Sequence, residues 1–192
     1  MRGILDALRG RRGRIDASAH APRVLSDHDF ADLHPRFTWM RDFLKSIAPS
    51  GQLPGRQHIE PAALKSVLPL INIVEVQQAE GALRFRFRLV GSVQTEVAGR
   101  EITGLLVDDA VLPRYVERIT SNMRAVVQFR APVYDQLAIA HPNREFIASE
   151  RVYFPLAANG RDIDMLILIH AYPKLELDGS GTIASSLFAV RG

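Results

Sequence analysis

The fold of this chain is decided by the stretch Leu83-Arg84-Phe85-Arg86-Phe87-Arg88-Leu89-Val90-Gly91. Apolar and basic residues alternate along it with a period of two, and only an extended strand separates them onto opposite faces. The apolar face holds Leu83, Phe85, Phe87 and Leu89. The other face holds Arg84, Arg86 and Arg88, which we expect to be solvated. Burial of one face alone is typical of an antiparallel sheet, so the stretch predicts such a strand.

Two elements next to this strand extend the pattern. Residues 71–76 form an apolar strand, and Gly81 marks the turn of a hairpin between the two. Downstream, the glycines at 91, 99 and 104 separate short helical turns. A longer amphipathic helix is then predicted over residues 112–127, with its apolar side chains on one stripe.

Three more strands are predicted after this helix, at residues 131–138, 145–156 and 162–172. Asn159-Gly160 indicates a hairpin between the last two. The order ββ, short helices, long helix, βββ predicts an α+β fold. We expect a five-stranded antiparallel sheet with helices on one face.

A helix is also predicted before the sheet, over residues 35–47. Pro35 can open it in the first turn, and Pro49-Ser50-Gly51 ends it. Its apolar residues recur at three- and four-residue spacing: Phe37, Met40, Phe43, Leu44 and Ile47. The last strand is apolar on both faces, with Met165 and Ile167 on one and Leu166 and Leu168 on the other. We expect the N-terminal helix or a partner subunit to cover one of these faces.

Composition excludes several kinds of chemistry. The 192 residues include no cysteine, which excludes disulfides, thiolate metal sites, cysteine nucleophiles and cysteinyl–flavin photochemistry. No apolar run approaches the roughly 18 residues of a membrane span, so we expect a cytoplasmic protein with no transmembrane segment. The net charge is only +3, and the arginines of the first segment form no nucleic-acid-binding motif. No nucleic-acid partner is therefore expected.

Candidate cofactor and catalytic motifs are sparse. The six histidines are scattered without metal-ligand spacing, and no metal site is predicted. His170 is interpreted as a strand-end histidine with a hydrogen-bond partner, with contact to a ligand or metal as the alternative. The sequence contains neither a Gly-x-Ser-x-Gly nucleophile motif nor a phosphate-binding glycine loop. The cofactor stays unknown, and non-covalent flavin binding stays open.

Several short motifs, in their order, are similar to those of a PAS domain. They are Leu53-Pro-Gly-Arg56, Ile59-Glu-Pro61, Leu68-Pro-Leu-Ile71, Phe87-Arg-Leu-Val-Gly91, Gly99-Arg-Glu-Ile-Thr-Gly104, Glu150-Arg151 with Pro155-Leu156, and Asp164-Met165. More closely, the chain resembles a stand-alone PAS-domain family common in alphaproteobacteria, over about residues 37–171. This resemblance implies a sensory or protein-interaction module and not a defined reaction. Haem-binding PAS domains are expected to offer a histidine from the long helix, which has none here, so haem is not expected.

Composition, periodicity and the resemblance together divide the chain into four predicted segments. They are a basic flexible tail at 1–27, an N-terminal cap helix at 28–52, a PAS-like sensor domain at 53–172 and a C-terminal extension at 173–192. No kinase, cyclase, phosphodiesterase or DNA-binding segment is identified in these residues. Any output is therefore expected to pass through a homodimer or a signalling-protein partner.

A PAS fold places its cavity between the inner sheet face and the helices. The residues that we expect to bind a ligand there are Phe87, Leu89, Val116, Ile119, Met123, Tyr134, Met165 and Ile167. Because few of them are polar, the ligand is expected to be a small apolar molecule. The predicted interface consists of Phe37, Met40, Phe43, Leu166 and Leu168.

Two alternatives to a non-catalytic signalling module stay open. One is a receptor or carrier that binds a metabolite or cofactor and has no protein output partner. The other is an enzyme on the same scaffold, which a compact polar cluster inside the cavity would favour.

Overall fold

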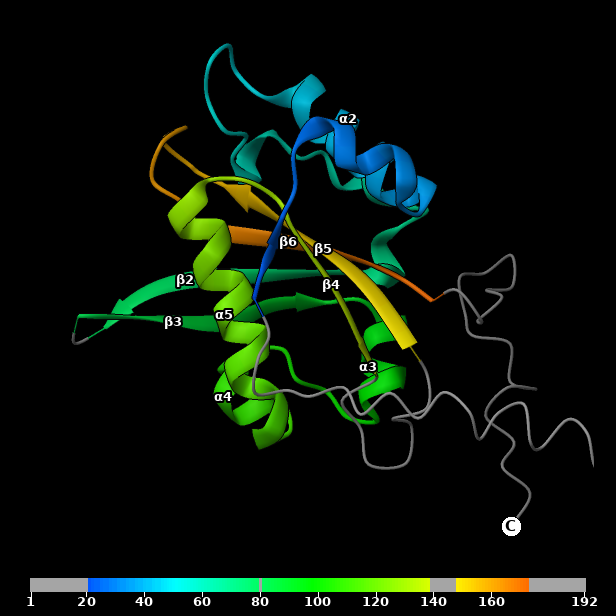
Figure 1. The fold of residues 1–192 in the computed structure, drawn as a ribbon, viewed down its shortest axis with the longest axis vertical. Helices are drawn as coiled ribbons and strands as arrows, with labels where there is room; N and C mark the ends of the chain where they lie inside the picture. The colour runs from blue at the N-terminus through cyan, green and yellow to red at the C-terminus, as the bar shows by residue number, and fades with distance from the viewer. Residues whose placement is uncertain (1–20, 80, 139–147, 173–192) are drawn as a thin grey trace, which may run out of the picture.

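The sheet is antiparallel throughout and has six strands in the order β1-β4-β5-β6-β2-β3 (Figure 1). The computed structural model describes residues 21–79, 81–138 and 148–172. The strands are β1 (Arg23–Val24), β2 (Ile71–Ala79), β3 (Ala82–Val90), β4 (Val133–Ala138), β5 (Ala148–Leu156) and β6 (Met165–Ala171). The predicted α+β class and antiparallel pairing are confirmed.

The helices agree closely with the amphipathic patterns. They are α2 (Pro35–Ile47), α3 (Ser92–Ala98), α4 (Val107–Ala110) and α5 (Pro113–Phe129). Short 3₁₀ helices connect them to the sheet: η2 (Asp27–Asp32), η3 (Arg56–His58), η4 (Pro61–Leu64) and η5 (Leu68–Leu70). Gly81 at φ 79° and Gly99 at φ 72° adopt the left-handed conformation, which explains the glycines at these turns.

The sheet has one strand more than predicted. Arg23 and Val24 pair with Tyr134 and Val133 of β4, within the range predicted to be a flexible tail. The next residue, Leu25, is buried and donates its backbone N–H to the carbonyl of Pro132 at 2.8 Å. A two-residue strand is too short to show a period in the sequence. Residues 1–20 and 173–192, predicted as tail and extension, lie outside the described residues.

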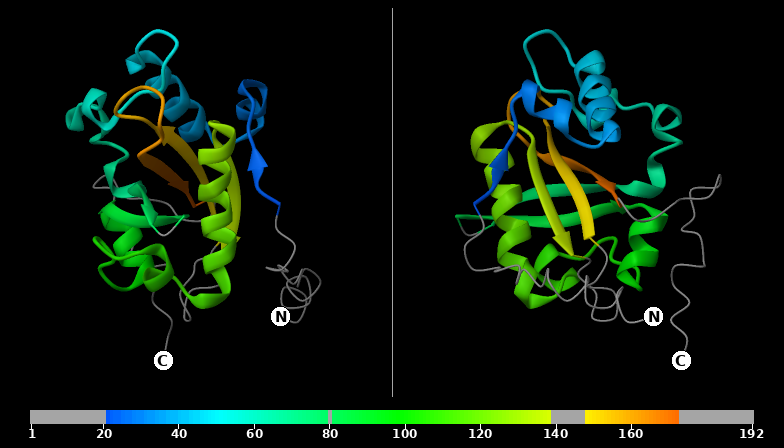
Figure 2. Two further views of the ribbon diagram at one scale, coloured as in Figure 1. Left: turned by 90° about the vertical axis from the view of Figure 1, so that its left-hand side faces the viewer. Right: turned by 45° about the vertical axis from the view of Figure 1, so that its right-hand side comes forward.

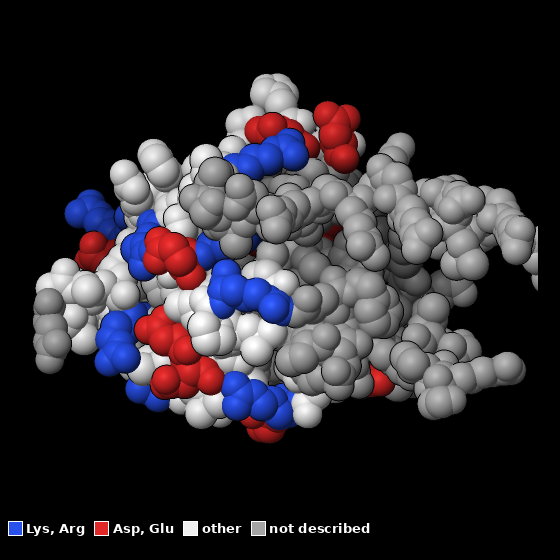
Figure 3. Space-filling model, turned by 60° about the horizontal axis from the view of Figure 1, so that its bottom comes forward, with Lys and Arg blue, Asp and Glu red and all other residues white. Residues whose placement is uncertain are grey.

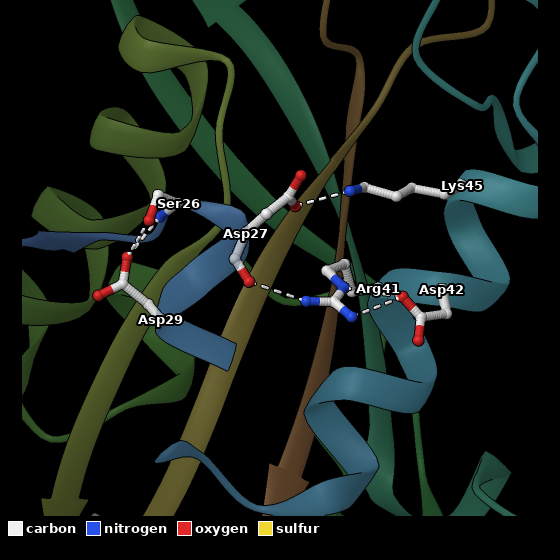
Figure 4. A network of polar contacts seen from close by, with 6 residues as sticks. All are labelled: Ser26, Asp27, Asp29, Arg41, Asp42 and Lys45. Carbon is white, nitrogen blue, oxygen red and sulfur yellow. Dashed lines mark hydrogen bonds and ion pairs between the residues drawn. The ribbon is translucent and has the colours of Figure 1, made fainter. Parts of the chain in front are cut away.

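A second anchor joins η2 to α2 (Figure 4). Lys45 Nζ lies 2.6 Å from Asp27 Oδ1, and Arg41 Nη1 donates to the Asp27 carbonyl at 2.9 Å. The Arg41 guanidinium also lies over the Phe30 ring, 4.9 Å from its centroid. These contacts hold residues 27–32 against the cap helix, so the folded part of the chain begins before the predicted boundary at residue 28.

Both faces of the sheet are covered, one by α4 and α5 and the other by the predicted N-terminal helix α2 (Figures 1 and 2). On one face, α2 and the 3₁₀ helices bury Phe37, Met40, Ile167 and Ile169. On the other face, α4 and α5 bury another cluster that includes Phe85, Phe87, Ile119, Met123, Leu166 and Leu168. The two apolar faces of β6 are therefore both satisfied within this chain, one of them by α2 as expected.

An irregular pairing between β2 and β3 changes the face of one predicted core residue. Ile73 pairs with Leu89 whereas the next residue, Val74, pairs with Phe87. Arg88 is thus the extra residue of a bulge, and a bulge interrupts the two-residue alternation. Phe87 faces α5, and Leu89 packs with the α2 cluster instead.

Candidate functional site

A cavity of about 90 Å³ lies between the α5 face of the sheet and the helices α3 and α5. Its apolar wall includes Phe87, Val97, Ile102, Ile119, Met123 and Leu168. Its polar wall includes Asn72, Gln94, Ser149, Arg151, Tyr153, His170 and Tyr172. The lining is therefore mixed, with more polar side chains than the sequence led us to expect.

Strand geometry gathers the polar wall. Ser149, Arg151 and Tyr153 are alternate residues of β5, so their side chains share one face. The β6 pairing places His170 opposite Arg151, and β2 contributes Asn72 opposite Leu168. Three neighbouring strands thus direct their polar side chains to the same end of the sheet.

Buried hydrogen bonds connect this wall to α3. The Tyr172 hydroxyl donates to Gln94 Oε1 at 2.8 Å. His170 lies between Asn72 Nδ2 and Ser149 Oγ, each 3.4 Å from one ring nitrogen. If Asn72 Nδ2 donates to Nε2, the proton of the neutral ring is on Nδ1 and is directed at Ser149.

Burial keeps the titratable groups of the cavity uncharged, with one exception. Burial, and then the charge of Arg151, lowers the pKa of His170 well below its usual range. Burial raises the pKa of both Tyr153 and Tyr172 to about 12. At neutral pH these three side chains are therefore uncharged, and Arg151 carries the charge of the polar wall.

Four buried polar atoms of the lining have no hydrogen-bond partner among the described residues: Asn72 Oδ1, Gln94 Nε2, Arg151 Nε and the Tyr153 hydroxyl oxygen. Asn72, Gln94 and Arg151 are only 5%, 7% and 8% exposed, and Tyr153 has no exposed surface. An unsatisfied buried polar group costs about 1–3 kcal/mol, and more when it is charged. Such atoms in a cavity wall indicate that water or a ligand supplies the missing contacts.

A buried ion pair joins α5 to β4 next to the cavity. Arg118 of α5 donates to Asp135 Oδ1 through Nε at 3.0 Å and Nη2 at 2.6 Å. Asp135 is the direct cross-strand partner of Arg151. The pair thus ties α5 to β4 next to the charged cavity residue.

Three of the predicted ligand-binding residues line this cavity: Phe87, Ile119 and Met123. Val116 is only partly buried and does not line it. The other four, Leu89, Tyr134, Met165 and Ile167, pack in the cluster beneath α2. The assignment of the two faces of β6 is therefore reversed relative to the prediction. Because both faces carry apolar residues, their alternation does not indicate which face points to the cavity.

The predicted interface residues lie mostly in the core. Phe37 and Met40 have no exposed surface, Leu166 is buried against the α5 cluster, and Leu168 lines the cavity. Phe43 is half-buried and stacks on Trp39, with ring centroids 5.5 Å apart. Trp39 itself is 40% exposed, so α2 does present an aromatic surface, which Trp39 forms with the predicted residue Phe43 and without Phe37 and Met40.

A second hollow, of about 190 Å³, lies between η2, α2 and the end of β5. It is larger, but its buried lining is apolar, and its charged residues already have partners. Arg41 and Lys45 are bonded to Asp27, and Arg130 donates to the backbone carbonyl of Arg161. Its wall contains none of the described side-chain atoms that are buried without a partner. The smaller cavity is therefore the better candidate for a specific site.

Where described residues are visible in Figure 3, acidic and basic side chains are interspersed and form no extended patch of one sign. No group of three metal-ligating side chains occurs in residues 21–79, 81–138 and 148–172. Within the same residues, no helix has the length and apolarity needed to cross a bilayer.

Comparisons with known proteins identify the family of this chain. A family model described as "PAS domain" matches residues 37–169. One similar solved structure is the PAS domain of a protein from Colwellia psychrerythraea, with 15% sequence identity and a TM-score of 0.42. The match covers 58% of this chain and 92% of that structure. No curated protein matches the chain.

Proposed function

Because the chain belongs to the PAS domain family, a family of sensory and signalling modules, we propose that it senses a small molecule bound in the cavity beneath α3 and α5. The observation that carries this proposal is the set of unpartnered atoms on Asn72, Gln94 and Arg151 in one cavity wall. A purely structural core would pair these groups or replace them with apolar side chains.

Native mass spectrometry of freshly purified protein, together with its absorption spectrum, tests this proposal. We expect a bound small-molecule mass that is absent from an Ala98→Leu variant, because Ala98 lines the cavity and a larger side chain there would fill it. An Ala63→Leu variant is the control, because Ala63 is exposed on η4 and outside the cavity. Ligand retained in Ala98→Leu would place the binding site elsewhere.

We further propose that the signal leaves through protein contacts made by α2. Because α2 covers the sheet face that was predicted to contact a partner, we assign the contact to the solvent-facing side of α2 instead. Its exposed Trp39–Phe43 pair is the feature that supports this assignment. The simplest partner is a second copy of the chain.

Light scattering after size exclusion tests dimerisation. A dimer that becomes a folded monomer in a Trp39→Ser/Phe43→Ser variant is the expected result. A wild-type monomer at all concentrations would contradict dimerisation. Together with a bound ligand, it would favour the alternative of a receptor or carrier without a protein output.

The compact polar cluster also raises the alternative of an enzyme. Ser149, His170 and Asn72 are residue types that can act as nucleophile, base and orienting group. However, both contacts of His170 are 3.4 Å, whereas such pairs are usually 2.6–3.2 Å apart. We propose that the site is non-catalytic, and we expect no labelling by a fluorophosphonate probe; labelling at Ser149 would contradict this.

A further inference from the structure

We propose that the cavity recognises a small carboxylate whose negative charge is bound by Arg151 and whose short apolar remainder contacts Phe87, Ile119 and Met123. This inference rests on the proposed function, namely that the cavity holds a ligand. It adds the chemical class of that ligand and the residue that selects it.

The charge balance around the cavity is the first argument. Arg118 and Arg151 are 9% and 8% exposed, and the carboxylate that acts on both of them is Asp135, which is 1% exposed. Arg118 directs two hydrogen bonds to Asp135 Oδ1 and a third to the Gln136 carbonyl. Among the described residues, two buried cations thus share one carboxylate. A buried charge needs a counter-charge, and an anionic ligand beside Arg151 supplies it.

The open hydrogen-bond donors are the second argument. Arg151 Nε and Gln94 Nε2 are both donors, both are buried, and both residues line the same cavity. A carboxylate accepts hydrogen bonds through two oxygens, and guanidinium–carboxylate contacts are among the strongest in proteins. Asn72 Oδ1, the open acceptor, suits a hydroxyl or an ordered water that accompanies the ligand.

The lining offers no internal anion that would compete for this position. His170, Tyr153 and Tyr172 are uncharged at neutral pH because burial disfavours the imidazolium and both phenolates. None of the residues that line the cavity is an aspartate or a glutamate. The polar end of the cavity is therefore positive, and the carboxylate that acts on Arg151, Asp135, is shared with Arg118 and lies outside the lining.

Size limits the rest of the ligand. A cavity of about 150 Å³ is enough for benzene, and this one measures about 90 Å³. Apolar and polar side chains both line this small volume, so the ligand needs a charged end and a tail of only a few carbon atoms. A monocarboxylate such as propionate matches both requirements.

Titration calorimetry with propionate and with propionamide tests the inference, in a buffer free of phosphate and carboxylates. The two probes have nearly the same shape and differ in charge. We expect wild-type protein to bind one propionate per chain at least about tenfold tighter than propionamide. In Arg151→Gln this preference should disappear, Arg151→Lys should retain part of it, and Arg84→Gln, an exposed arginine outside the cavity, should leave it unchanged.

The ratio of the propionate and propionamide affinities of the wild-type protein decides the inference by itself. The test therefore does not depend on whether every variant folds. Equal affinity for the two probes, or a preference for propionamide, would overturn the carboxylate assignment. Failure of both probes to bind also overturns it. In that case native mass spectrometry separates the two levels: a neutral bound molecule leaves the sensing proposal standing, whereas a cavity that never holds a ligand refutes both.

Discussion

Arg118 of α5 and Asp135 of β4 form a buried ion pair in which Nη2 lies 2.6 Å from Oδ1. The side chains are 9% and 0% exposed. The two residues come from consecutive elements, and their contact fixes α5 across the sheet at the level of the cavity. Because the same aspartate is opposite Arg151, the pair links the packing of the long helix to the charge of the ligand site.

Breaking this pair should strongly destabilise the protein. We expect Arg118→Met to lower the free energy of unfolding by about 3–5 kcal/mol, because it leaves the Asp135 carboxylate without its bonded guanidinium. The matched control is Arg124→Met on the same helix. Arg124 Nη2 lies 2.7 Å from Glu117 Oε1, but the two side chains are 43% and 84% exposed, so loss of this ion pair should cost less than about 1 kcal/mol. Equal costs in urea unfolding would contradict the buried role of Arg118.

Stability should fall in mild acid because of His170. Burial, and then Arg151, lowers the pKa of this histidine in the folded protein, whereas the unfolded chain binds a proton near pH 6.5. The neutral His170 side chain therefore makes its full contribution to the free energy of unfolding above pH 6.5, and this contribution is lost as the pH falls below that value. We expect the free energy of unfolding of wild type, relative to His170→Gln, to decrease by about 1.4 kcal/mol from pH 7.5 to 5.5. Parallel pH profiles for the two proteins would show that His170 is accessible to protons when folded.

Two phenylalanines on α2 should have different roles. Phe37 has no exposed surface, so Phe37→Ala should lower the free energy of unfolding by about 3–5 kcal/mol. Phe43 is half-buried beside Trp39, and Phe43→Ala should cost about 1–2 kcal/mol. Equilibrium unfolding in urea measures both. If Phe37→Ala were as mild as Phe43→Ala, α2 would not be packed on the sheet as described.

Gly91 is required for close packing and not for backbone conformation. A Cβ at this position would overlap the backbone carbonyl oxygens of Pro69 and Leu68. We expect Gly91→Ala to reach the upper end of the roughly 1–3 kcal/mol typical of overpacking. Gly81, at φ 79° with open space around it, is the contrast. Gly81→Asn should change the midpoint of thermal unfolding little, because asparagine tolerates positive φ; a loss as large as that of Gly91→Ala would be unexpected.

Local patterns predicted the elements well because their periods follow from backbone geometry. The alternation in residues 83–89 identifies β3, and the spacing of Phe37, Met40 and Leu44 identifies α2. Neither period indicates which other element packs against the apolar face. Alternation placed Leu89 with Phe87, but the bulge at Arg88 separated them.

The sequence by itself determined the longer helices, the strands β2 to β6, the antiparallel α+β class and the similarity to PAS domains. Tertiary structure alone decided which face of β6 meets α5, since both faces are equally apolar and only the positions of α2 and α5 distinguish them. It also decided the chemistry of the cavity. Asn72, Gln94, Arg151 and His170 lie on four different elements, and none is unusual in its own segment. They form a site only because the fold buries them side by side. There, whether each polar atom has a hydrogen-bond partner depends on residues that are distant in the sequence.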